Sequence, residues 1–322
     1  MTLFNPPRAA VVTGAGGFIG RHLSRFLSQN GCDVRGIGYS AMSDEDRMNL
    51  GISLWHSGGI SSSALKRTSV GAEIIYHCAG SGSVPLSLRE PMTDFRSNVL
   101  ATAEVLEFSR EAGGIPVVFM STAGVYGKAN NMPIRIRDPL MPISPYGMNK
   151  VAGEQLMRQY GTFFGVPGAI VRLFSVYGEG LRKQLLWDAS QKLQRGDLVF
   201  FGTGNETRDW LHVSDAVSLI ARIGNCADLD VPTFHGATGN AVRLRDILEL
   251  LTSGYGIEGT IVFNNQLRQG DPSDYQADIA SSLELGWTPE VPLTDGILRY
   301  TDWFNREVAL KSAAHIARRG LR

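Results

Sequence analysis

A tyrosine and a lysine four residues apart, Tyr146 and Lys150, are the side chains best suited to proton chemistry in this sequence. Ser144 and Pro145 precede them and suit the N-cap and first position of a helix, because the serine oxygen can accept from a free backbone N–H and proline has none to lose. Residues four apart lie on one helix face. An ammonium beside a phenol favours the phenolate and lowers a pKa that is normally about 10. The pair is a candidate proton donor and acceptor; the competing interpretation is a surface pair on an amphipathic helix.

Two hydroxyl residues, Ser121 and Thr122, follow the apolar segment 116–120. That segment has the composition of a buried strand, and functional groups in an open α/β sheet gather at the carboxyl ends of strands. A hydroxyl there can hold a substrate oxygen while Tyr146 moves its proton.

Three glycines, Gly14, Gly17 and Gly20, lie between an expected strand, 9–13, and an apolar-periodic helix, 18–29. Glycines in this context allow a tight turn and a close backbone approach, and the helix N-terminus receives a pyrophosphate. The pattern predicts a dinucleotide site, with Phe18 and Ile19 at the start of its helix.

The second expected strand, 34–38, ends without the acid that usually holds the adenosine ribose hydroxyls. Gly38 stands near that place, and the next carboxylate is Asp44. Without that negative charge a 2′-phosphate is not repelled, and Ser40 and Arg47 are candidates to bind one. NAD and NADP both stay open, NADP being slightly favoured by this feature. Introducing an acid by Gly38→Asp is expected to shift the preference toward NAD.

Strands alternate with helices along the first half of the chain, which predicts an α/β fold with a Rossmann-type doubly wound parallel sheet. A smaller, interleaved C-terminal substrate lobe is expected after residue 173, where segments shorten and Gly and Asn increase. The expected dinucleotide-binding domain is 1–172 plus about 207–237, the substrate lobe is 173–206 plus about 238–306, and a basic tail spans 307–322. Further strands are expected at 73–78 and 168–173, and helices at 98–111, 145–164, 213–223 and 244–252; in the first of these helices Val99, Ala103, Leu106 and Phe108 are expected to face inward.

The composition of the chain argues against a nucleic-acid-binding protein, a membrane protein and a metal site. The 31 basic and 31 acidic residues cancel, so no overall field attracts nucleic acid or a membrane surface. No apolar run reaches the roughly 20 residues of a membrane span, and the first residues lack a signal-peptide pattern. The three cysteines have no ligand spacing, so no metal is expected. We expect a cytoplasmic protein.

Together these motifs resemble those of the extended short-chain dehydrogenases/reductases, in the NAD(P)-dependent sugar-nucleotide epimerase/dehydratase group, and the chain looks like the UDP-galactose 4-epimerase-like enzymes. The resemblance covers the chain from Val11 to about Phe304. It is carried by residues 13–20, 77–80, 98–99, 121–127, 146–150, 208–213, 268–272, 277–278 and 285–287.

The resemblance implies that Tyr146 is the acid/base, that Lys150 binds the nicotinamide ribose and lowers the tyrosine pKa, and that Thr122 holds the reacting sugar oxygen. Ser121 lies one position earlier and is the weaker candidate. With the residues described above, the predicted cofactor set is Gly14, Gly17, Phe18, Ile19, Gly20, Ser40, Ala79, Gly80 and Asn98, together with Tyr146 and Lys150.

The resemblance also implies a nucleotide-diphosphate sugar as substrate. Arg208 and Arg268 match arginines that clamp the diphosphate, although an interlobe salt bridge is the competing interpretation of each. Asp271 matches a residue near the nucleotide ribose and Phe201 lies where the family lines the base pocket. The predicted substrate set is Ser83, Thr122, Ser175, Phe201, Arg208, Arg268 and Asp271.

Departures from the family pattern narrow the activity. The 4,6-dehydratases continue the threonine site with an Asp-Glu pair that performs elimination, whereas this chain has Ala123 and Gly124. We therefore expect no dehydratase. Ser175 stands where the family often has Asn, and residues 57–60 lack the usual acid after the third strand.

The predicted activity is hydride transfer at a carbon, most simply C4, of a nucleotide-activated hexose. We favour a 4-epimerase narrowly; an NADPH-dependent 4-keto-sugar reductase uses the same residues and stays the alternative, and a non-catalytic cofactor-binding regulator is a remote one. The resemblance further implies a role in polysaccharide biosynthesis and a homodimer formed by the helices at 98–111 and 145–164.

Overall fold

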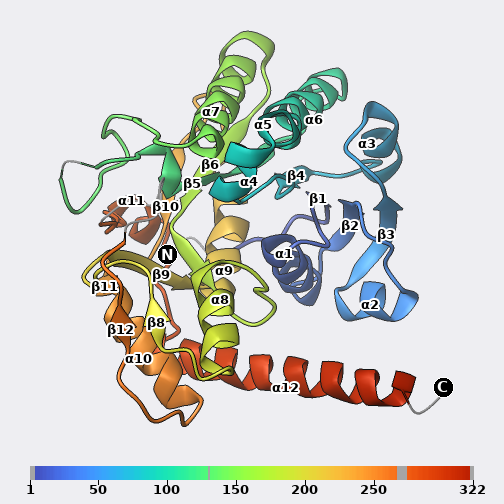
Figure 1. Ribbon diagram of the computed structural model, residues 1–322. Coiled ribbons are helices and arrows are strands. Elements are labelled where there is room, and N and C mark those ends of the chain that lie inside the picture. The colour runs from blue at the N-terminus through green and yellow to red at the C-terminus, as the bar shows by residue number, and fades with distance from the viewer. Residues whose placement is uncertain (1–3, 130, 267–273, 320–322) are drawn as a thin grey trace.

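A seven-stranded parallel sheet forms the centre of the computed structural model, which describes residues 4–129, 131–266 and 274–319 (Figure 1). The strand order is β10-β6-β5-β4-β1-β2-β3, and every neighbouring pair is parallel. This confirms the predicted doubly wound Rossmann-type sheet. Its strands are β1 (Ala9–Thr13), β2 (Asp33–Gly38), β3 (Ile52–Ser57), β4 (Ile74–His77), β5 (Val117–Thr122), β6 (Gly168–Leu173) and β10 (Thr233–Gly236).

Helices cover both faces of this sheet, which is why its inner strands are apolar along their whole length. Every residue of β1, β4 and β6 is buried. Helices α1 and α9 pack against each other over one face, and α3, α6 and α7 cover the other. These helices are α1 (Phe18–Gln29), α3 (Ser62–Thr68), α6 (Ala101–Glu111), α7 (Pro145–Phe164) and α9 (Val213–Gly224), with the short α2 (Asp44–Asn49) beside β3.

The chain changes direction across the sheet between β1 and β4. From β1 it proceeds to β2 and β3 on one side, and from β4 to β5, β6 and β10 on the other. Loops that leave the carboxyl ends of two such strands diverge, and the crevice between them is the usual ligand site of an open α/β sheet. The glycine loop after β1 and the segment after β4 both begin there.

A smaller lobe is built from two short sheets, β11-β9-β7 and β12-β8, with helices packed around them. Strand β9, which we expected in the first domain, pairs with β7 and β11. It then leads from this lobe into α9. The elements are β7 (Ser175–Tyr177), α8 (Gln184–Leu193), β8 (Val199–Phe200), β9 (Thr207–His212), β11 (Ala241–Arg243), α10 (Leu244–Gly254) and β12 (Val262–Phe263), followed by α11 (Ala280–Leu283) and the long α12 (Leu293–Arg319).

The helix expected at 98–111 begins differently. After α4 (Val84–Arg89) and α5 (Pro91–Phe95), a π-helical turn, η1 (Arg96–Leu100), precedes α6. The wider turn changes which side chains face inward, and such turns are frequent at functional sites. The buried residues are Asn98, Thr102, Val105, Leu106, Phe108 and Ser109, whereas Val99 and Ala103 are only half-buried.

Within the part of the chain that the structure describes, no helix is both long enough and apolar enough to cross a membrane.

Candidate active site

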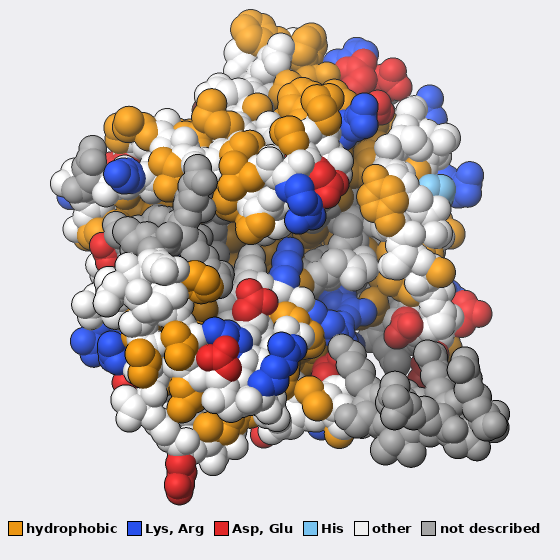
Figure 2. Space-filling model, viewed as in Figure 1, with side chains coloured by type: hydrophobic (Ala, Val, Ile, Leu, Met, Phe, Trp, Pro, Cys, Tyr) orange, Lys and Arg blue, Asp and Glu red, His pale blue; other side chains and the backbone are white. Residues whose placement is uncertain are grey.

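A cleft of about 360 Å³ opens where the carboxyl ends of the central strands meet the smaller lobe. Figure 2 shows a hollow near the centre of the molecule, with Lys and Arg side chains in it and at its edge. Its walls come from the start of α1, the segment after β4, the end of β5, the start of α7 and the segments around β7 and α8.

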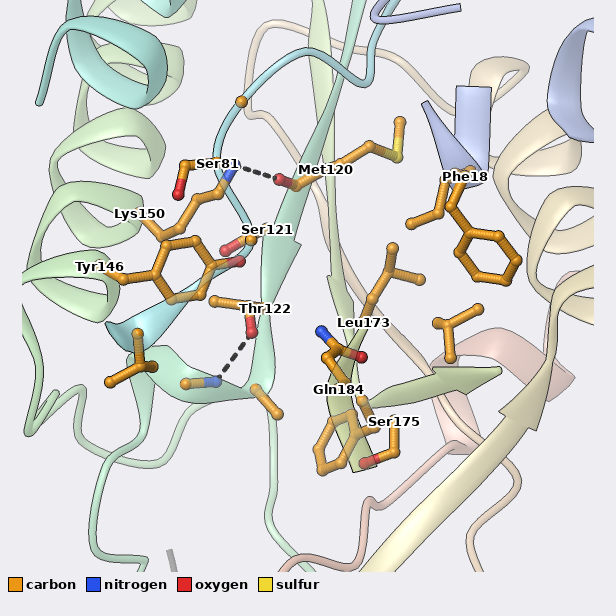
Figure 3. A pocket seen from close by; sticks show the side chains of 18 of the residues that line it. Phe18, Ser81, Met120, Ser121, Thr122, Tyr146, Lys150, Leu173, Ser175 and Gln184 are labelled. Carbon is orange, nitrogen blue, oxygen red and sulfur yellow. Dashed lines mark hydrogen bonds between the residues drawn. The ribbon is translucent and has the colours of Figure 1, made fainter. Parts of the chain in front are cut away.

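Helix α7 carries the tyrosine and the lysine into this cleft (Figure 3). The Ser144 hydroxyl accepts from the backbone N–H of Gly147 at 3.1 Å, so the predicted N-cap is present. Gly147 lies so close to the turn after β5 that a Cβ there would be 2.7 Å from the Gly124 carbonyl oxygen. The helix therefore starts in contact with the end of β5, which brings Tyr146 to the threonine.

Lys150 is buried behind Tyr146. Its Nζ donates to the carbonyl of Met120 at 3.0 Å and lies 4.9 Å from the ring centroid of Phe119. Burial lowers the pKa of Lys150 to about 8, while the nearby Asp94 carboxylate acts in the opposite direction. An ammonium with so low a pKa is poised to change charge just above neutral pH.

The Tyr146 phenol is not activated in the way expected. Burial raises its pKa to about 12, the Thr122 hydroxyl lowers it by hydrogen bonding, and the Asp94 charge raises it. The structure does not show the predicted lowering of the tyrosine pKa, because burial outweighs the hydrogen bond with Thr122. Positive charge or a further hydrogen bond at the phenol would favour the phenolate.

Thr122 and Ser121 face different partners. The Thr122 hydroxyl lies beside Tyr146 and accepts from the Gly124 N–H at 3.1 Å. The Ser121 hydroxyl donates to Oε1 of Glu154 at 2.6 Å in the buried layer beneath the cleft. The threonine is therefore the hydroxyl available to a substrate oxygen, and the serine anchors the helix.

The Glu154 carboxylate joins α7 to the sheet. Glu154 is 1% exposed and accepts from Arg172 of β6, which is 2% exposed, at 2.9 and 2.6 Å. Arg172 also donates to the hydroxyl of Tyr126 at 2.6 Å. Glu154 lies one helical turn beyond Lys150, so this ion pair keeps the reactive face of α7 against β5 and β6.

A second buried carboxylate, Asp94, had no sequence signal. It accepts from the side-chain amides of Asn98 at 3.0 Å and Asn149 at 2.7 Å. It thus ties the π-helical turn to the residue that lies between Tyr146 and Lys150 on α7. Its charge affects both of those groups, as their pKa shifts indicate.

The backbone around the glycine loop fits a dinucleotide. Gly14 has φ +67°, and a Cβ on it would lie 2.7 Å from Ala79. The N-cap of α1, Gly17, has no side-chain cap, so the first amides of the helix are open to a pyrophosphate. The buried Oδ1 of Asn98 has no hydrogen-bond partner within the described residues and points at Gly80 in the cleft wall, where a Cβ would be 2.6 Å away.

A tryptophan lies against the end of β2, where the sequence predicts the adenosine ribose and lacks the usual acid. The indole of Trp55, on β3, covers the end of β2: a Cβ on Gly38 would lie 2.6 Å from its Cη2, and one on Gly36 2.8 Å from its Cε3. Arg47 donates to the carbonyls of Ile52 and Ser53 at 3.2 and 2.9 Å. Arg47 is therefore engaged with β3, and the glycine at 38 makes room for the indole.

Sequence comparison decides the family to which this arrangement belongs. The model described as "NAD dependent epimerase/dehydratase family" matches residues 10–231. The chain belongs to this family.

Relatives in this family match over nearly their whole length. A UDP-glucose 4-epimerase from Azospirillum brasilense is 30% identical over 316 residues, covering 90% of this chain and 89% of that protein. A structure described as MoeE5 in complex with UDP-glucuronic acid and NAD is 28% identical with a TM-score of 0.84, covering 93% and 99% of the two chains. A structure of a DesIV double mutant, a dTDP-glucose 4,6-dehydratase from Streptomyces venezuelae, is 26% identical with a TM-score of 0.84, covering 92% and 96%.

Most of the residues predicted for an epimerase/dehydratase family site meet at this cleft. Gly14, Ala79 and Asn98 lie directly behind its wall. The predicted residues that line it are Gly17, Phe18, Ile19, Gly20, Gly80, Thr122, Tyr146, Lys150, Ser175 and Arg208.

Several predicted residues do not line the cleft. Ser83 caps α4, its hydroxyl accepting from the Leu86 N–H at 3.2 Å, and Phe201 is 44% exposed outside the cleft lining. Ser40 lies by the glycine loop, with Oγ 3.1 Å from the position of a Cβ on Gly16. Arg268 and Asp271 lie outside the described residues.

The cleft lining also includes Lys183, Gln184 and Tyr275, which stand outside the predicted site sets. The sequence places residues 182–187 among the segments that set the fit of a sugar, without a role for any one side chain, and it gives no signal for Tyr275. Among the described residues that line the cleft, the charged ones are Lys150, Lys183 and Arg208, and none is Asp or Glu. The cleft is therefore suited to anionic ligands. No group of three or more His, Cys, Asp or Glu side chains is placed to hold a metal anywhere in the described ranges.

Proposed function

We propose that this family member is an NAD-dependent 4-epimerase of a nucleotide-diphosphate hexose. The observation that carries the proposal is the contact of Tyr146 with Thr122 in a cleft lined by cations. The UDP-glucose 4-epimerase name of the Azospirillum relative and the NAD described in the MoeE5 complex support the same reaction class and cofactor.

The chain's own residues account for the proton chemistry. A bound nicotinamide would supply the hydride acceptor and donor. Thr122 holds the oxygen on the reacting sugar carbon, and Tyr146 takes the proton of that hydroxyl as the carbonyl forms. Tyr146 returns the proton when the carbonyl is reduced. The base step needs the phenolate, which positive charge near the phenol favours, and Lys150 is the buried cation closest along the helix.

The two residues after Thr122 support epimerisation over dehydration. A dehydration also needs an acid and a base at the neighbouring carbons. Here Ala123 and Gly124 occupy the positions of that pair, and a side chain at 124 would start 3.4 Å from Thr122 Oγ1. A carboxylate would fit there, yet the described lining has none. The DesIV similarity means that family membership alone does not decide this point.

A reductase is the second candidate, because the end of β2 lacks the ribose-binding acid. The two reactions differ in what the purified protein carries. An epimerase reduces and reoxidises its bound cofactor within each turnover and so ends the cycle holding NAD⁺, whereas a reductase releases oxidised cofactor and needs NADPH. Measuring the identity and redox state of copurified cofactor separates them: retained NAD⁺ supports the epimerase, and an empty site that fills with NADPH contradicts it.

Replacing the tyrosine tests the catalytic assignment. We expect Tyr146→Phe to lower turnover of UDP-glucose, UDP-galactose or UDP-glucuronate by about 100-fold or more, since proton transfer by a positioned group contributes on this scale. The matched control is Tyr39→Phe, because Tyr39 is 85% exposed and lies outside the cleft lining. Equal turnover by Tyr146→Phe and wild type would sink the proposed mechanism.

We also propose a homodimer through α7, as the sequence predicts, but with α5 beside it in place of the helix predicted at 98–111. Exposed apolar side chains collect there, and Figure 2 shows hydrophobic surface over these helices. Met92 is 57% exposed and Met148 is 59% exposed, and both line one shallow apolar groove between the two helices. A patch of this kind on two neighbouring helices suits a face that packs against its own copy.

A further inference from the structure

Lys183 extends from the smaller lobe across the cleft to the dinucleotide-binding domain. It is the N-cap residue of α8, and Gln184 after it has φ +66°, a left-handed conformation that is uncommon for a residue with a side chain. The Lys183 Nζ lies 3.3 Å from the position of a Cβ on Gly82, in the segment between β4 and α4. Glycine at 82 leaves space for the ammonium.

Lys183 is an exposed residue of the cleft lining, and its ammonium has no hydrogen bond or ion pair with any described residue. Surrounding protein atoms lower its pKa, and its charge also lowers the pKa of Lys150. Two other lysines have partners: Lys150 donates to Met120, and Lys192 pairs with Asp197 at 3.1 Å. A cation held in a cleft beside another cation is stabilised by an anionic ligand.

The surroundings of Lys183 favour a phosphate as that ligand. The described lining has three cations and no carboxylate, so the cleft itself supplies no counter-ion. Helix α8 begins at the cleft with no side-chain cap on its first amides. A lysine ammonium binds phosphate as a point charge and does not need a fixed donor geometry.

We propose that Lys183 binds a phosphate oxygen of a nucleotide held in the cleft, and that this contact ties the smaller lobe to the dinucleotide-binding domain. The proposal rests on the proposed function, which requires the cleft to bind two nucleotides, the cofactor and the nucleotide sugar. The phosphate belongs to the cofactor or to the nucleotide sugar, because Gly82 follows the cofactor wall at Gly80 while Lys183 itself lies on the substrate lobe with Arg208.

Titration calorimetry with NAD⁺ and with UDP tests the contact and identifies the source of the phosphate. Lys183→Met removes the charge and keeps the side-chain length; Lys183→Arg retains the charge. Loss of a charge-assisted hydrogen bond is expected to weaken binding of one ligand about tenfold or more, with Lys183→Arg close to wild type. The matched control is Lys66→Met, an exposed lysine on α3.

The two ligands give separate outcomes for the source of the phosphate. Weakened NAD⁺ binding supports the proposal with the cofactor as the source, and weakened UDP binding supports it with the nucleotide sugar as the source. A Lys183→Met protein that binds both ligands within twofold of wild type overturns it, as does an equal loss in Lys66→Met. A wild-type protein that binds both ligands but converts no sugar nucleotide contradicts the proposed function and leaves the lysine result unaffected.

Discussion

At the scale of single residues, the site depends on charges held out of water. Lys150 has a pKa of about 8 and Tyr146 one of about 12, both displaced toward their neutral forms by burial. The Asp94 carboxylate raises both values. The proton balance of the pair is therefore set in part by a residue that lies outside the cleft lining.

This arrangement predicts a pH profile and its change. The Lys150 ammonium is present below about pH 8 and is lost as pH rises, so kcat/KM is expected to fall on the alkaline side near that value. In Asp94→Asn the negative charge that raises the pKa of Lys150 is gone, so the alkaline limb is expected to move to lower pH. The measurement is kcat/KM from pH 6 to 10, with the exposed Asp44→Asn as control. An unchanged limb in Asp94→Asn argues against the coupling.

The choice between NAD and NADP also depends on single residues, and the Trp55 indole changes the result expected for Gly38→Asp. Gly38→Asp alone places a side chain against the Trp55 indole, so we expect weaker binding of both NAD⁺ and NADP⁺ instead of a switch. Gly38→Asp combined with Trp55→Ala gives the carboxylate room, and the preference for NAD⁺ should increase. Dissociation constants for both cofactors test this. A single variant that already prefers NAD⁺ as strongly as the double variant contradicts the role given to Trp55.

At the scale of elements, the position of α7 decides whether the site exists. Its first turn contacts the turn after β5 at Gly147, and its middle is joined to β5 and β6 through Glu154. The π-helical turn before α6 is joined to it through Asp94. Three contacts along one helix thus hold Tyr146 and Lys150 in place.

Removing the buried arginine should show how far the Arg172–Glu154 ion pair contributes to stability. Arg172→Met leaves Glu154 charged and buried without its main partner, so we expect the free energy of unfolding to fall by about 3–5 kcal/mol. Glu154→Leu with Arg172→Met removes both charges and should recover much of the loss. Urea unfolding of wild type and both variants provides the values. A double variant less stable than Arg172→Met would mean that packing, and not the unpaired charge, governs the site.

At the scale of the whole molecule, the apolar groove between α5 and α7 predicts that two copies of the chain form a dimer. One chain has a mass of 35.0 kDa, and light scattering is expected to report twice that value. Met92→Glu with Met148→Glu places charges in the proposed contact and should yield monomers, whereas Val70→Glu, at an exposed site just after α3 and outside the groove, should not. Wild type that elutes as a monomer at all concentrations contradicts the dimer.

Short segments of the sequence encode the local elements of this fold. The glycine loop, the strand ends and the Ser144-Pro145 start of α7 are local patterns, and backbone geometry converts each into the element that was predicted. Helix ends agreed where a cap or a left-handed glycine terminates them, as Gly165 does for α7. The parallel sheet follows from the alternation of these elements.

Contacts between residues far apart in the sequence depend on the folding of the whole chain. Trp55 covers Gly38, Asp94 contacts Asn149, and Lys183 reaches Gly82, each between separate elements with no periodic signal. The same holds for the pKa of Tyr146, because burial by the whole fold outweighs the lysine placed four residues away. Local spacing specifies which groups share a helix face; desolvation and long-range contacts determine their charge state and partners.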